Sequence, residues 1–159
     1  MTTATPAHNA APRHTDPRVG AVVDLFESLS PADLPGLRGV YAPDARFKDP
    51  FNAVQGLPAI ARIFDHMFRQ LDAPRFTVRD IVAQGDDVFL TWDFNFRTGR
   101  PGQRRGARAM QIHGASHLRF DAGGQVVMHR DYWDAAEELY EKLPIIGLVV
   151  RWLKRRAGG

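Results

Sequence analysis

Apolar residues recur every three or four positions through the first half of the chain, which is the spacing of helices. Asp16 and Pro17 are typical of a helix start and predict a first helix that ends near Ser30. A second helix is expected from Ser30 to Pro43 and a third over 57–71. Their expected buried sides comprise Val19, Val22, Val23, Phe26 and Leu29, then Leu34, Leu37, Val40 and Tyr41, then Ile60, Ile63, Phe64, Met67, Phe68 and Leu71.

The period then changes from helical to alternating, which is typical of strands. A short extended segment over 45–49 and a loop up to Gly56 precede this change. The predicted strands cover 76–83, 88–97, 108–120 and 125–133. Consecutive strands joined by short turns form an antiparallel meander, and helices must cover its apolar face. We therefore predict an α+β fold, a curved antiparallel sheet with about three N-terminal helices packed on its concave face.

Strand alternation also sorts the candidate site residues by face, because every second side chain points to the same side. Trp92 belongs to the apolar phase of its strand, which places Asp93 on the opposite side. Ser116 joins the inward phase of the following strand, whereas His113 and His117 point outward.

The last strand has two possible phases, and apolarity does not choose between them. One phase consists of Val127, His129, Asp131 and Trp133, and the other of Val126, Met128, Arg130 and Tyr132. The first would aim a histidine and a carboxylate into an aromatic cavity.

Composition limits the classes of function. The 159 residues, 44% of them hydrophobic, suffice for one domain with its own core, which we expect over 17–142. With 21 basic and 18 acidic residues the net charge is only +3, so nucleic acid is not an expected partner. The absence of cysteine excludes disulfides and thiolate catalysis. Residues 1–16 lack the hydrophobic region of a secretory signal, so we expect a disordered tail and a cytoplasmic protein.

The segment 143–159 is interpreted as a helical extension. Residues 143–153 are apolar almost all round, and three basic residues follow at 154–156. About eleven residues are too few to span a bilayer, which needs roughly 20. A lid over the pocket or a homodimer contact is the first interpretation, with the sheet as a further dimer surface. Contact of 143–156 with a membrane surface is the second.

The run from Tyr41 to Phe51, Tyr-Ala-Pro-Asp-Ala-Arg-Phe-Lys-Asp-Pro-Phe, resembles the corresponding stretch of the ketosteroid isomerase and SnoaL-like polyketide cyclase families. Gly56 and the ending over 130–134 extend this resemblance to about four-fifths of the chain. Both families belong to the NTF2-like superfamily, so the resemblance implies a cone-shaped fold around one deep apolar pocket. The superfamily includes isomerases, cyclases, epoxide hydrolases, dehydratases and binding modules.

Carried over residue by residue, the resemblance to ketosteroid isomerases is incomplete. Asp49 matches the aspartate that shuttles the proton in that family. The two donors of its oxyanion hole fall on Leu25, which cannot donate, and on Ser116. Since one such donor is typically worth roughly 3 kcal/mol, we do not expect ordinary steroid isomerisation.

The chain is also similar to the limonene epoxide hydrolases at the end of the sheet. Asp131 matches one member of their Asp-Arg-Asp triad, but the other two positions fall on Trp92 and Phe94. In the SnoaL-like cyclases the resemblance implies an acid/base aspartate near this last strand, which is again Asp131.

The sequence leaves two functions open. The first is acid/base chemistry, such as isomerisation, cyclisation or hydration of a small hydrophobic molecule, with no metal or other cofactor. The second is a non-catalytic module that binds a ligand or a partner protein, in which Asp49 is a turn residue and Asp131 pairs with Arg130 or Arg46. Candidate catalytic residues are Asp49, Asp131 and His129, and candidate substrate-binding residues are Trp92, Trp133, Phe64, Phe68, Met67, Leu90 and Ser116.

Overall fold

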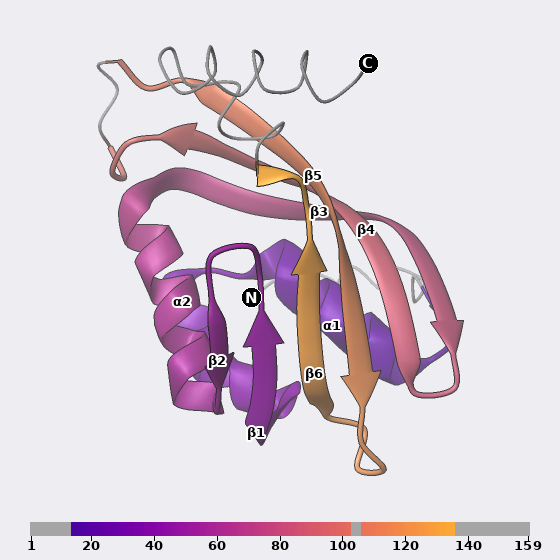
Figure 1. Ribbon diagram of the computed structural model, residues 1–159. Coiled ribbons are helices and arrows are strands. Elements are labelled where there is room, and N and C mark those ends of the chain that lie inside the picture. The colour runs from indigo at the N-terminus through magenta and orange to yellow at the C-terminus, as the bar shows by residue number, and fades with distance from the viewer. Residues whose placement is uncertain (1–13, 103–105, 136–159) are drawn as a thin grey trace, which may run out of the picture.

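A curved six-stranded sheet forms the body of the protein in the computed structural model, which describes residues 14–102 and 106–135 (Figure 1). The strands lie in the order β2-β1-β6-β5-β4-β3. Their bounds are β1 Tyr41–Lys48, β2 Ala53–Gln55, β3 Leu71–Gln84, β4 Asp87–Thr98, β5 Ala109–Phe120 and β6 Val126–Tyr132. All neighbours are antiparallel except β1 and β6, which run parallel. The sheet is therefore mixed, whereas consecutive hairpins alone predicted an antiparallel one.

In the described part of the chain, three helices precede or interrupt the strands and pack on the sheet. They are α1 Pro17–Ser28, the 3-10 helix η1 Pro31–Gly39 and α2 Leu57–Gln70. The side chain of Asp16 caps α1 by accepting a hydrogen bond from the backbone N–H of Arg18. Helix α1 packs on β3, and α2 packs on β1 and β3. The predicted α+β fold with about three helices against the sheet is confirmed.

The second helix is shorter and tighter than predicted. It ends at Gly39 as a 3-10 helix, and Tyr41 begins strand β1 instead of continuing the helix. Pro35 inside the segment has no N–H to donate, and it is followed by Gly36 and Gly39, which favour a helix poorly. Strand β2, only three residues long, lies where a loop was predicted.

A bulge in β6 settles the phase of the last strand. Arg119 is opposite Met128 and Phe120 is opposite Val126, so Val127 is the extra residue. Both Val126 and His129 are consequently buried, although they are three positions apart. Beyond the bulge His129, Asp131 and Trp133 follow the inward phase, which is the phase that carries the candidate chemistry.

The predicted C-terminal extension lies outside the described residues. This applies to the helix over 143–159 and to the membrane or dimer contact proposed for 143–156. Within residues 14–102 and 106–135, none of the helices combines the length and apolarity needed to cross a bilayer.

Candidate functional site

A cavity of about 400 Å³ lies between helix α2 and the concave face of the sheet. Phe47 of β1 and Phe76 of β3 both line it, although these strands stand far apart in the sheet order, so the sheet curls around the cavity. Its described wall includes six phenylalanines and two tryptophans. These aromatic residues are Phe47, Phe51, Phe64, Phe76, Trp92, Phe94, Phe96 and Trp133.

Trp92 is held at the floor of this cavity by a glycine on the neighbouring strand. Trp92 on β4 is directly opposite Gly114 on β5. A Cβ atom placed on Gly114 would lie 2.3 Å from the indole ring, so no larger residue fits without displacing Trp92. In this position the indole N–H donates to the hydroxyl of Ser116 at 2.9 Å.

Hydrogen bonds from two sides converge on Asp131. The Ser116 hydroxyl, which accepts from Trp92, donates to Oδ1 of Asp131 at 2.5 Å. Nε2 of His129 lies 2.7 Å from the same Oδ1, and the Tyr41 hydroxyl lies 2.6 Å from Nδ1 of His129. Tyr41, Ser116 and His129 are all buried, so the chain of contacts is shielded from water up to the carboxylate.

The chemistry of the partners fixes the direction of these bonds. Burial raises the pKa of the Tyr41 phenol well above its usual value of 10, and the charge of Asp131 adds to this, so Tyr41 keeps its proton. Its only hydrogen-bond partner among the described residues is Nδ1 of His129, which must then accept the phenolic hydrogen. His129 is thereby assigned as the neutral tautomer whose Nε2–H donates to an ionised Asp131.

One oxygen of Asp131 is left for a ligand. Both donors reach Oδ1, and Oδ2 has no hydrogen bond to a described residue. The Asp131 side chain is 15% exposed and lines the aromatic cavity. A partly accessible carboxylate thus borders an aromatic cavity.

Asp49 lines the same cavity but is occupied by its own turn. Its Oδ1 accepts hydrogen bonds from the backbone N–H groups of Phe51 at 2.7 Å and Asn52 at 2.5 Å. The Asn52 side-chain amide donates to both carboxylate oxygens, at 3.0 and 2.9 Å. Asp49 therefore shapes the turn after β1, as an aspartate before a proline often does.

The structure divides the predicted site residues into three groups. Asp49, Asp131, Trp92, Trp133, Phe64 and Met67 line the cavity. Ser116 and His129 lie directly behind Asp131 and touch it through hydrogen bonds. Leu90 is buried in the hydrophobic core, and Phe68 packs against that core from α2 without lining the cavity. Asp131 makes no ion pair with Arg130 or Arg46 within the described chain.

Sequence reasoning missed several contributors to the site. Tyr41 was assigned to a helix, although Pro43, two positions later, offered a signal that the helix stops early. His66 was not among the candidate residues; it is exposed but also lines the cavity. Phe94 and Phe96 were not among them either, although both share the phase of Trp92 on their strand and line the cavity.

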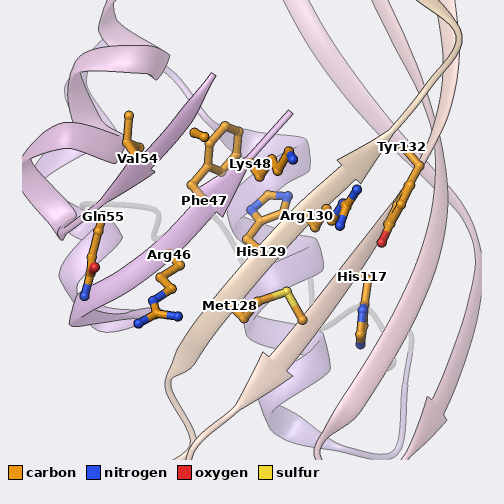
Figure 2. A pocket seen from close by; sticks show the side chains of 11 residues that line it. Arg46, Phe47, Lys48, Val54, Gln55, His117, Met128, His129, Arg130 and Tyr132 are labelled. Carbon is orange, nitrogen blue, oxygen red and sulfur yellow. The ribbon is translucent and has the colours of Figure 1, made fainter. Parts of the chain in front are cut away.

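The convex face of the sheet carries a different set of charges. Figure 2 shows a shallow pocket there, bordered by Arg46 and Lys48 of β1 and by Arg130 and Tyr132 of β6. Lys48 and Arg130 are paired in register, and the Arg130 guanidinium lies 4.8 Å from the Tyr132 ring centre. None of Arg46, Lys48 and Arg130 forms a salt bridge with a described residue.

Two carboxylates on this convex face, Asp93 and Asp87, are paired with arginines and histidines. Asp93 is bound by Arg79 through Oδ2 and by His113 through Oδ1, and the Arg79 hydrogen bonds in particular hold the pKa of Asp93 below its usual value. Asp87 is bound by His117 at 2.7 Å and Arg119 at 2.9 Å, contacts that likewise lower its pKa. Across the described residues, no group of three or more histidine or acidic side chains is arranged to hold a metal ion.

Comparison with known proteins is consistent with this architecture. The family model for the SnoaL-like domain matches residues 22–129. An NTF2-like protein of unknown function from Burkholderia pseudomallei is 18% identical, and the alignment covers 77% of this chain and 95% of that protein with a TM-score of 0.66. A candidate SnoaL-like polyketide cyclase from Jannaschia sp. CCS1 is also 18% identical, with coverages of 76% and 87% and a TM-score of 0.64.

A third similar structure, an LEH-like epoxide hydrolase from M. tuberculosis, is 15% identical, with coverages of 87% and 90% and a TM-score of 0.61. No curated protein matches the sequence. At these identities structural likeness establishes the fold alone. The family model confirms the resemblance to the SnoaL-like family.

Proposed function

The chain belongs to the SnoaL-like domain family, and we propose that its concave cavity binds a small hydrophobic molecule on which Asp131 acts as an acid/base group. The observation that carries this proposal is the position of Asp131. Two hydrogen-bond donors hold its Oδ1, no described residue donates to its Oδ2, and the side chain lines an aromatic cavity. Orientation by fixed donors and removal from bulk water are what a proton-transfer group needs.

The hydrogen-bond pattern gives each residue of the network a role. An ionised Asp131 accepts a proton from the substrate at Oδ2, and the resulting carboxylic acid can return it to another substrate atom. Ser116 and His129 position the carboxylate, and Tyr41 holds His129 in the tautomer that donates to Asp131. Isomerisation, cyclisation and hydration all require such a proton to be moved, and the cavity wall is apolar enough to keep the reacting atoms away from water.

The test is a search for ligands followed by measurement of turnover. Hydrophobic ketones, polyketide fragments, terpene epoxides and steroids would be screened by thermal shift, and each binder would then be assayed for conversion. Asp131→Asn should abolish turnover, because an amide cannot take the proton. The variant should still bind the ligand nearly as tightly as the wild type does. Asp80→Asn, which changes a carboxylate on the convex face, is the matched control and should keep full activity.

Tyr41→Phe distinguishes positioning from a merely structural effect. It removes the donor to Nδ1 of His129 without changing the cavity wall, so kcat should fall while KM changes little. Turnover that survives unchanged in Asp131→Asn would refute the acid/base role.

A second candidate function is ligand binding without catalysis. The Ser116 hydroxyl, which resemblance to ketosteroid isomerases would make an oxyanion donor, is buried and already donates to Asp131. Asp49 is likewise engaged by its own turn. Ligands that stabilise the wild type, Asp49→Asn and Asp131→Asn equally, with no conversion by any of the three proteins, would favour this second function.

A further inference from the structure

We infer that the aromatic cavity selects ligands carrying a positively charged, alkyl-substituted nitrogen over neutral ligands of the same shape. This inference rests on the proposed function only in taking the same cavity as the ligand site. It concerns the charge of the ligand, about which the fold says nothing.

The first observation is the charge balance of the cavity. Two carboxylates, Asp49 and Asp131, line it, and its described lining contains no lysine or arginine. His66 is the one lining residue in this set that could become cationic, and its side chain is exposed. Among the described lining residues, a negatively charged ligand would therefore meet two carboxylates and no lysine or arginine.

The second consideration is the kind of donor that holds Asp131. Ser116 donates a hydroxyl hydrogen, and the bond from Tyr41 assigns His129 as a neutral imidazole. The negative charge of Asp131 is thus stabilised by two hydrogen-bond dipoles, and neither of these two donors supplies a positive charge. A carboxylate near an apolar cavity gains most from an ionic partner, because water there is too scarce to screen the attraction.

The third observation is the nature of the wall. Phe76 is stacked on Phe94 with ring centroids 4.4 Å apart and meets Trp92 edge to face at 5.4 Å. Phe51 and Trp133 form another edge-to-face pair at 5.4 Å. Aromatic faces attract alkylammonium groups through their negative electrostatic potential, and this attraction is strongest where water is excluded. Walls of this kind combined with fixed carboxylates fit an organic cation.

A quaternary nitrogen is the sharpest probe, because it is charged at every pH and has no proton to give to Asp131. The test measures binding of 3-(trimethylammonio)phenol and of 3-tert-butylphenol at pH 7 by titration calorimetry. The two molecules have the same heavy-atom skeleton and differ in charge. The cation should bind wild-type protein about tenfold more tightly or better.

Two variants assign the preference to its causes. Asp131→Asn should bring the affinity ratio close to one while leaving binding of 3-tert-butylphenol within about twofold. Phe76→Leu should also lower the ratio, because it removes an aromatic face and keeps an apolar wall. Asp80→Asn on the convex face should retain the wild-type ratio, which controls for a change of net charge.

The outcomes separate this inference from the proposed function. Equal or tighter binding of the neutral phenol by wild-type protein overturns the inference and leaves the cavity as a site for hydrophobic molecules. A cation preference that Asp131→Asn retains also overturns it, since the charge of Asp131 would then not be its cause. Failure of both phenols to bind overturns the inference and counts against the cavity as a ligand site.

Discussion

Asp131 and Asp93 lie on opposite faces of the same sheet, and their surroundings differ in every respect that matters for chemistry. Both side chains are largely buried, 15% and 6% exposed. Asp93 uses both oxygens, one for Arg79 and one for His113. Asp131 accepts from Ser116 and His129 on one oxygen, no described residue donates to its other oxygen, and its side chain lines the cavity.

This difference indicates which of the two buried carboxylates can interact with a substrate. A carboxylate saturated by an arginine and a histidine is stabilised in its ionised form and has little capacity left for a substrate. One that is oriented by neutral donors keeps both its charge and a free acceptor. The concave cavity is thus lined by acidic and aromatic side chains. On the convex face Asp87 and Asp93 are paired with arginines and histidines, and three cations, Arg46, Lys48 and Arg130, lie beside one another.

The largest effect is expected from breaking the floor of the concave face with Gly114→Ala. The added methyl group would lie 2.3 Å from the Trp92 ring, so the indole must move and its hydrogen bond to Ser116 must break. We expect the free energy of unfolding to fall by about 2–3 kcal/mol. Chemical denaturation measures this loss, and tryptophan fluorescence should report the displaced ring.

Gly20→Ala is the control for this substitution. Gly20 lies in α1 with no atom within 4 Å of an added Cβ, so alanine there should stabilise the protein by about 0.5–1 kcal/mol through its higher helix propensity. If Gly114→Ala were as stable as the wild type, the close packing of Trp92 on β5 would be wrong, and with it the geometry assigned to Ser116.

A smaller, pH-dependent effect should distinguish the convex face. Hydrogen bonds from Arg79 and His113 lower the pKa of Asp93 in the folded protein, with Arg79 the larger cause. The unfolded chain should have the ordinary value of about 3.9. The resulting stabilisation is therefore complete above that pH and is lost as the pH falls through the lower folded value. Asp93→Asn lacks this contribution.

The measurement is Tm from pH 2 to pH 6. Wild-type Tm should drop more steeply below pH 4 than Tm of Asp93→Asn, and the two proteins should differ most at pH 5 to 6. Asp44→Asn serves as the control, because Asp44 is exposed on β1 and forms no salt bridge with a described residue, so its profile should follow the wild type. Parallel profiles for wild type and Asp93→Asn would contradict the lowered pKa.

The sequence predicted the two faces well where alternation is regular. Alternation of side chains along β4 correctly predicts that Trp92 points inward and Asp93 outward, because no bulge interrupts the pairing of β4 with β5. In β6 the same rule could not choose a phase, because the bulge at Val127 buries residues of both phases. A bulge depends on how the partner strand is paired, which local sequence does not encode strongly.

The hydrogen-bond network was harder to predict than the faces. Tyr41 and His129 are 88 positions apart and meet because β1 runs parallel to β6, a pairing that chain order does not suggest. Proline and glycine in 35–39 end the preceding helix early and turn Tyr41 into the first residue of a strand. Asp131 was identified from resemblance and inward phase, but its neutral partners could be recognised only once these strands were placed together.

The smallest effect is expected on the cationic part of the convex face. Lys48 and Arg130 are neighbours in register on β1 and β6, and like charges placed side by side on a sheet destabilise it. Lys48→Gln should therefore raise the free energy of unfolding by about 0.3 kcal/mol at low ionic strength. Lys48→Arg, which keeps the charge, should bring no gain. In 1 M salt, where the screening length is about 3 Å, the gain should vanish. A loss of stability in Lys48→Gln would mean that Lys48 makes a favourable interaction that outweighs its repulsion from Arg130. The convex face would then not be destabilised by its neighbouring cations.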